Sequence, residues 1–177
     1  MSSLLALSKD RHAPAGNTLY TLHELSSTLT QQTIPPAPNG TVGPFIANSS
    51  ILPPGLPAGV DMHAGEILLA EASPSFPEPL IYVSNRNQAT DVKDPRGDAI
   101  TIFRVEPALE LLGYVFTGLD QVRGMELGGP QKEFLIAAAV GGTAGTKVYK
   151  RTDGGKNLTM LVQNTEIPTR SSFVWLD

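Results

Sequence analysis

The chain has 177 residues, enough for one domain with a buried core, and it contains no cysteine. A disulfide framework and a thiolate metal site are therefore excluded. The formal net charge of −4 and the sequence pI near 5.3 argue against a general nucleic-acid-binding protein, which needs a basic face to displace counterions from phosphate. A small anionic substrate remains compatible, because a local arginine can outweigh a mildly negative surface.

The N-terminal residues 1–10 include a short apolar run without the basic segment that opens a signal peptide. No stretch approaches the roughly 20 apolar residues that a membrane-spanning helix needs. We therefore expect a cytoplasmic protein without a membrane partner. We also expect a poorly ordered lead-in over residues 1–17, followed by one domain over residues 18–177.

Proline and glycine punctuate the whole chain. The 15 prolines and 17 glycines cluster between short apolar runs, a pattern typical of short strands separated by loops. No stretch shows the periodicity of about 3.6 residues that indicates an amphipathic helix. The sequence therefore predicts an all-β fold.

The first group of predicted strands follows the lead-in. Strands are expected over residues 19–24, 27–32 and 45–52. The segment 35–40, Pro-Pro-Ala-Pro-Asn-Gly, is a loop by composition, because proline removes backbone donors and Asn-Gly favours a turn.

Two further groups each contain four predicted strands. The strands are 65–71, 80–86, 99–105 and 111–117 in the second group, and 122–127, 134–140, 146–151 and 158–163 in the third. Asp153-Gly154-Gly155 is the expected turn between the last two strands, because glycine supplies a positive φ. Residues 172–176 remain as a single terminal strand.

The three groups are repeats of one unit. Aligning their second strands places Tyr20, Tyr82 and Leu135 at equivalent positions, 62 (82 minus 20) and 53 (135 minus 82) residues apart. Four strands per unit with a period near 50 residues predict β-propeller blades. A closed ring needs about four blades or more, so the chain is either part of a longer propeller or completes a ring by self-association.

Four runs, in this order and spacing, resemble the seven-bladed lactonase family, also called the cycloisomerase 2 family. They are Leu-Tyr-Thr-Leu-His-Glu-Leu-Ser-Ser-Thr (19–28), Ala-Gly-Glu-Ile (64–67), Leu-Ile-Tyr-Val-Ser-Asn-Arg-Asn (80–87) and Val-Arg-Gly-Met (122–125). The family contains 6-phosphogluconolactonases of the bacterial type and fungal carboxy-cis,cis-muconate cyclases. The resemblance begins near residue 19 and corresponds to the C-terminal half of a family member, which implies a partial β-propeller of about three four-stranded blades.

The resemblance also implies site residues. Glu24 matches the active-site glutamate of the family, and Arg86 matches its active-site arginine in the Ser-Asn-Arg motif. His23 replaces the usual asparagine before the glutamate. The Arg11-His12 pair resembles a second family motif, but it is too near Glu24 to come from the preceding strand, and we interpret it as a coincidence. The catalytic set is therefore incomplete in this chain.

The two matched residues suit different chemistry. An arginine donates two parallel hydrogen bonds to a carboxylate or phosphate and stabilises developing negative charge. Glu24 can act as a general base in lactone hydrolysis or as the proton-transfer group of a cycloisomerase. Neither role of Glu24 or Arg86 requires a metal or a cofactor, and none is expected. The alternative is that the two residues form a solvated ion pair between blades, which contributes little.

Three more residues are candidates for substrate binding. His63 precedes an expected inner strand, and Glu66 and Arg123 lie near the starts of two such strands. The competing interpretation of His63 is a loop histidine that forms a hydrogen bond with the backbone. The competing interpretation of Glu66 and Arg123 is a polar plug that fills the central tunnel.

Two functions from different classes follow. The first is an enzyme that hydrolyses a sugar lactone or cycloisomerises a carboxymuconate, with Glu24 as acid or base and Arg86 as the anion clamp. The second is an inactive partial propeller that serves as a binding or structural module. Its exposed strand edges would favour self-association.

Overall fold

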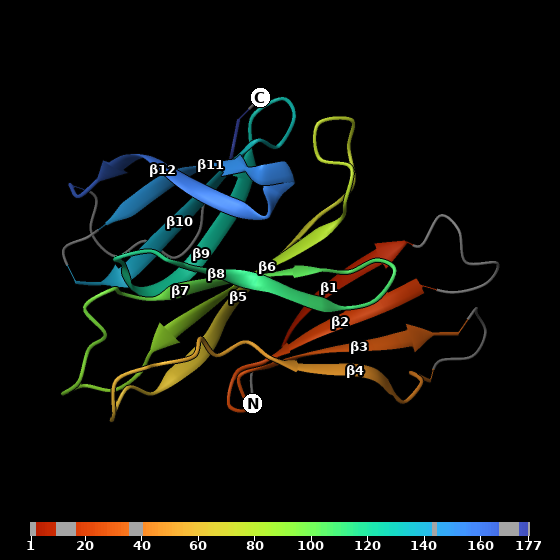
Figure 1. The fold of residues 1–177 in the computed structure, drawn as a ribbon, viewed down its shortest axis with the longest axis horizontal. Coiled ribbons are helices and arrows are strands. Elements are labelled where there is room, and N and C mark those ends of the chain that lie inside the picture. Colours follow the sequence, from red (N-terminus) through yellow and green to blue (C-terminus); the bar gives the residue numbers. More distant parts are fainter. Residues whose placement is uncertain (1–2, 10–16, 36–40, 143–144, 167–173, 177) are drawn as a thin grey trace.

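The computed structural model describes residues 3–9, 17–35, 41–142, 145–166 and 174–176. These residues form three antiparallel four-stranded sheets and one short 3-10 turn (Figure 1). None of the described segments forms a helix long and apolar enough to cross a membrane.

Each sheet is built from four consecutive strands. The first contains β1 (Ser3–Lys9), β2 (Asn17–His23), β3 (Thr28–Ile34) and β4 (Phe45–Ser50). The second contains β5 (Met62–Ala70), β6 (Leu80–Asn87), β7 (Ala99–Arg104) and β8 (Glu110–Phe116). The third contains β9 (Asp120–Gly128), β10 (Phe134–Gly141), β11 (Thr146–Thr152) and β12 (Asn157–Asn164), with the 3-10 turn η1 (Asp153–Gly155) before its last strand.

The sheets are successive blades of a propeller. Every strand pairs antiparallel with the next strand of its own sheet, and the first strands of neighbouring blades, β1 with β5 and β5 with β9, lie against each other (Figure 1). This arrangement confirms the predicted all-β fold and the partial propeller of three four-stranded blades. It also brings equivalent strand ends of neighbouring blades to the same end of the molecule.

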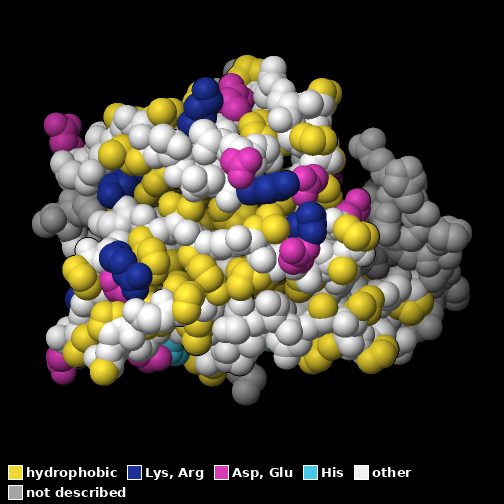
Figure 2. All heavy atoms as spheres, in the orientation of Figure 1, with side chains coloured by type: hydrophobic (Ala, Val, Ile, Leu, Met, Phe, Trp, Pro, Cys, Tyr) yellow, Lys and Arg dark blue, Asp and Glu magenta, His cyan; other side chains and the backbone are white. Residues whose placement is uncertain are grey.

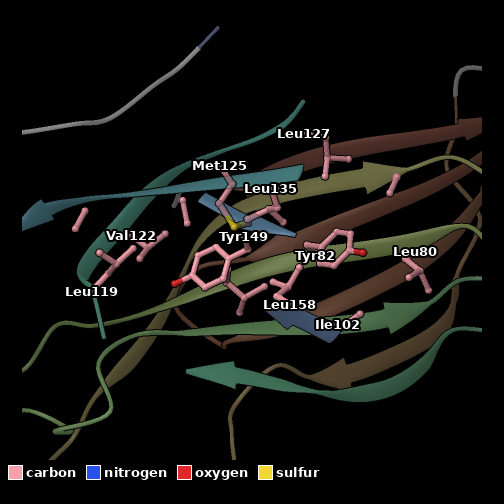
Figure 3. Close-up of a cluster of buried hydrophobic side chains, with 14 residues drawn as sticks. Leu80, Tyr82, Ile102, Leu119, Val122, Met125, Leu127, Leu135, Tyr149 and Leu158 are labelled. Carbon is pink, nitrogen blue, oxygen red and sulfur yellow. The ribbon is translucent and has the colours of Figure 1, made fainter. Parts of the chain in front are cut away.

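The apolar core lies between the blades. Tyr20, Leu22 and Leu29 of the first blade pack against Ile81 and Phe103 of the second in one buried cluster. A second cluster joins the second and third blades (Figure 3); it includes Leu80, Tyr82, Ile100, Ile102, Leu119, Val122, Leu135, Tyr149 and Leu158. Alternate residues of β6 therefore face opposite neighbours, which explains why the whole strand is buried.

The predicted equivalence of Tyr82 and Leu135 is wrong by one residue. Both side chains lie in the cluster between the second and third blades, so they face each other across that interface. Equivalent residues of successive blades must face the same way, as Tyr20 and Tyr82 do. Leu135 faces the opposite way from Tyr82, so the residue that matches Tyr82 is the next one along β10, Ile136. A shift of one residue along a strand moves a side chain to the opposite face.

Both chain ends also differ from the prediction. We expected no strand before residue 19, but Ser3–Lys9 forms β1 and pairs with β2 over its whole length. Its apolar run is typical of an inner strand. The terminal strand expected over 172–176 is absent from the described residues 174–176, where Trp175 instead stacks on Phe134 with ring centroids 6.0 Å apart.

Candidate active site at the ends of β2 and β6

Arg86 is the centre of the candidate site. It lies near the end of β6, and only 4% of its side chain is exposed. Its Nε donates to the Ala64 carbonyl oxygen at 3.3 Å, its Nη1 donates to Gln121 Oε1 at 3.2 Å, and its Nη2 forms an ion pair with Glu24 Oε1. A guanidinium has five N–H donors, and these contacts with described residues use three of them.

Glu24 reaches Arg86 from the neighbouring blade. It is the first residue of the turn after β2, and 27% of its side chain is exposed. The pair therefore joins equivalent ends of the second strands of two blades, as the sequence predicted. The ion pair between blades that the alternative interpretation expected is therefore present, with Arg86 almost fully buried and Glu24 partly exposed.

The β5 backbone makes room for Arg86. The pairing of β5 with β6 shifts between Ala64 and Ile67, which is a β-bulge. A Cβ atom at Gly65 would lie 2.5 Å from the Val122 carbonyl oxygen and 3.2 Å from Arg86 Cδ. Glycine at this bulge therefore lets the arginine side chain pass over the inner strand.

Gln121 connects Arg86 to the third blade. Its Oε1 accepts from Arg86 Nη1 and, at 2.9 Å, from Gln88 Nε2, while its own Nε2 donates to the Asn87 carbonyl oxygen. Its φ of 64° is uncommon for a residue with a side chain. The strained backbone thus supports a contact that holds the guanidinium.

Charged neighbours surround the guanidinium. Burial lowers the pKa of Arg86, and the positive charge of the exposed Arg123 on β9 lowers that pKa further. The carboxylates of Glu24 and Asp98 act in the opposite direction. Arg86 stays charged, since an arginine does not lose its proton in a protein. The candidate site therefore combines Arg86, Arg123 and Glu24, and the two cations favour an anionic ligand.

Asp98 joins the second and third blades at the end of the molecule where Arg86 lies. It is buried, and it accepts the N–H of Asn87 at 2.9 Å and the N–H of Val122 at 2.7 Å. Burial raises the pKa of Asp98 to about 6, against the lowering effect of these hydrogen bonds. The carboxylate thus ties the end of β6 to β9 beside Arg86.

His63 lies inside β5 rather than before it. It is paired in register with Arg86 across the β5–β6 ladder. Its Nε2 lies 3.1 Å from Asp61 Oδ2, so its partner is a side chain and not the backbone. The histidine is therefore close to the candidate site, with its imidazole engaged by an exposed carboxylate.

Glu66 lies in the β5 bulge, and its contacts are with residues other than Arg86. Its Oε1 accepts the N–H of Ile67 at 2.9 Å. Burial raises the pKa of Glu66, and the nearby carboxylate of Glu126 raises it further, although the Ile67 N–H opposes both. None of these contacts joins Glu66 to Arg86, so the structure groups it with Glu126 on the adjacent inner strand.

A cavity of about 260 Å³ opens beside this end of the blades. Its lining includes Asn87, Lys93, Asp98 and Asp120, but neither Glu24 nor Arg86. No group of three or more side chains suited to a metal ion occurs among the described residues. The Arg11-His12 pair lies outside the described residues.

The sequence indicated Glu24, Arg86 and Arg123, but it did not indicate Gln121 or Asp98. Both act through a partner that is distant in the chain, which no local motif reveals. Gly65 did carry a signal, because an isolated glycine in a strand often marks a bulge or a close approach of chains.

Comparison with known proteins agrees with this architecture. The family profile described as "Lactonase, 7-bladed beta-propeller" matches residues 9–175. The chain belongs to this lactonase family. No curated protein sequence matches the chain.

Two solved structures share the fold of this lactonase-family chain. One is described as a "putative 6-phosphogluconolactonase" from Bacteroides fragilis, with 18% identity and a TM-score of 0.63 over 88% of this chain. The other is the periplasmic gluconolactonase PpgL of Pseudomonas aeruginosa, with 18% identity and a TM-score of 0.64 over 86% of this chain. The chain covers 37% of the length of each.

Proposed function

We propose that the chain supplies the anion-binding arginine and the acid–base glutamate of a lactone hydrolase. The observation that carries the proposal is the contact between Arg86 and Glu24, which joins matching strand ends of two blades in a lactonase-family chain. The buried guanidinium of Arg86, together with the nearby positive charge of Arg123, suits the phosphate of a phosphorylated sugar lactone or a carboxylate of carboxymuconate.

The proposed reaction uses Glu24 for proton transfer and Arg86 for electrostatic stabilisation. Glu24 takes a proton from a water molecule whose oxygen attacks the carbonyl carbon of the lactone. Arg86 holds the anionic group and stabilises the developing oxyanion. The ring C–O bond then breaks, and the ring oxygen receives the proton from Glu24, which leaves an open-chain hydroxy acid. The exposed Arg123 adds a second positive charge near Arg86.

Hydrolysis is favoured over cycloisomerisation by the comparison. The two solved structures compared above are described as a putative 6-phosphogluconolactonase and a gluconolactonase, and neither description names a cyclase. We therefore propose 6-phosphogluconolactone or gluconolactone as substrate, and carboxymuconate as the competing substrate. A cytoplasmic location remains part of the proposal, and fractionation of the native cells is its test, since PpgL is periplasmic.

The experiment follows acid release from 6-phosphogluconolactone and gluconolactone, and loss of the substrate for carboxymuconate, with the purified chain. We expect the phosphorylated lactone to be hydrolysed with the highest kcat/KM, because its dianion best fits two cations. Arg86→Met should lower kcat/KM at least about 100-fold, within the range for loss of one electrostatic group. The control is Arg96→Met, since the exposed Arg96 pairs with the buried Asp94 and contacts neither Glu24 nor Arg86. Equal turnover by the wild type and Arg86→Met would overturn the assignment.

A further inference from the structure

A second buried arginine lies between the second and third blades. Arg151 of β11 is only 3% exposed. Its guanidinium carbon lies 3.8 Å from the centre of the Phe76 ring and 5.5 Å from that of Tyr82. No carboxylate forms an ion pair with it among the described residues, so a buried positive charge is left without a counter-charge. Such a charge is costly unless it is paired or bonded.

The hydrogen bonds of Arg151 are incomplete. Its Nε donates to the Tyr82 hydroxyl at 2.8 Å, and that hydroxyl donates to the Gly155 carbonyl oxygen at 2.6 Å. Its Nη1 donates to the Lys132 carbonyl oxygen at 2.9 Å. Its Nη2 is buried and has no partner within the described part of the chain. An acceptor from a ligand would complete the set.

Arg151 lines a cavity of about 420 Å³. This volume lies within the range of about 300–1,000 Å³ that is usual for small-molecule sites. Leu68 and Leu127 form part of an apolar wall, and Lys132, Glu71 and Glu126 add charged groups to the lining. The lining therefore combines two cationic side chains, Arg151 and Lys132, with two carboxylates, Glu71 and Glu126.

This cavity is separate from the Arg86 site. Its lining includes Ala70, which pairs with Leu80 at the start of β6, whereas Arg86 lies near the end of that strand. Six residues of strand separate Leu80 from Arg86, or roughly 20 Å. In Figure 3 the hydroxyl groups of Tyr82 and Tyr149 point toward opposite ends of the same cluster, and only the Tyr82 hydroxyl bonds Arg151.

The geometry points to a binding site for a small hydroxylated organic acid in this cavity. The carboxylate of the ligand accepts from Arg151, and its hydroxyl groups donate to Glu71 and Glu126. The site does not depend on the proposed lactone hydrolysis, because it shares no residue with the pair of Arg86 and Glu24.

The test is a calorimetric titration of the full chain carrying Arg86→Met, which removes the other anion clamp. The probes are gluconate and the neutral polyol sorbitol at equal concentration and fixed ionic strength. We expect saturable one-to-one binding of gluconate and none of sorbitol. Absence of gluconate binding, or equal binding of sorbitol, would overturn the proposal.

Three variants test whether gluconate binds in the cavity lined by Arg151. Arg151→Met, which keeps an unbranched side chain between the two rings, should weaken gluconate binding at least tenfold. Because this variant removes a buried group, Ala72→Phe provides a second route: Ala72 is exposed at the cavity, and phenylalanine there should obstruct it with at least a tenfold loss. Ala58→Phe, at an exposed position outside the lining, should leave affinity within twofold. Unchanged binding in Ala72→Phe would contradict the site.

Discussion

At the scale of single residues, the candidate site depends on a glycine and a buried acid that are not themselves its chemical groups. Gly65 gives Arg86 its path across β5, and Asp98 ties the ends of two blades beside the guanidinium. The contacts of Asp98 are not visible in a local motif, because they join segments that are distant in the chain, whereas Gly65 carried only the general signal of an isolated glycine in a strand. Glu24 and Arg86 were visible because a family pattern surrounds both.

Gly65→Ala tests whether the absence of a side chain at residue 65 is what makes room for the Arg86 side chain. The added Cβ would meet the Val122 carbonyl oxygen at 2.5 Å and Ser84 Oγ at 2.6 Å, so the bulge must shift. We expect a loss of about 1–3 kcal/mol in the free energy of unfolding, measured by urea denaturation. The control is Gly113→Ala, where a Cβ meets nothing within 4 Å and φ is not positive. A loss at Gly113 as large as that at Gly65 would contradict the steric explanation.

Asp98 should make stability depend on pH. Its folded pKa of about 6 exceeds the ordinary 3.8, so the folded state holds this proton more tightly than the unfolded state. The free energy of unfolding of the wild type, relative to Asp98→Asn, should therefore fall as pH rises from about 4 to about 6. The difference of roughly two pKa units limits the change to about 3 kcal/mol. A flat difference between pH 4 and 6 would show that Asp98 titrates normally.

At the scale of elements, alternation of side chains and turn residues predicted most strands to within a few residues. β1 was missed because its apolar run lacks alternation and a recognisable hairpin turn. The third blade was aligned one residue out of register, because Leu135 and Ile136 are both apolar and the sequence does not say which of them faces Tyr82. Contacts across the blade interface decide that question.

The outer strand β12 gives a prediction about association. It pairs only with β11 in the sheet order of the described residues, and Met160, Leu161 and Val162 on it are all more than half exposed. We propose that this edge pairs with a second copy of the chain. Val162→Lys should weaken self-association at least tenfold in sedimentation equilibrium, because a charge on an edge strand opposes pairing. Leu52→Lys, an exposed leucine outside β12, is the control. A chain that is monomeric at every concentration would rule out the proposal.

At the scale of the whole molecule, the blades are held together by apolar clusters at their interfaces, and the buried Arg86 and Arg151 lie at the same interfaces. On the face in Figure 2, hydrophobic side chains run between the sheets, with acidic and basic groups close to one another beside them. The fold class and the blade number followed from the repeat, whereas the partners of Arg86 and Arg151 arise only when the blades pack. Both proposed sites therefore lie at interfaces between neighbouring blades.

The measurement that tests the central claim most directly is a double-mutant cycle of Glu24 and Arg86. It compares kcat/KM for 6-phosphogluconolactone in the wild type, Glu24→Gln, Arg86→Met and the double variant. If the two side chains act as one unit, each single change should lower kcat/KM at least about 100-fold, and the double variant should fall less than about tenfold further. Single variants that retain wild-type activity, or losses that multiply fully in the double variant, would contradict the account.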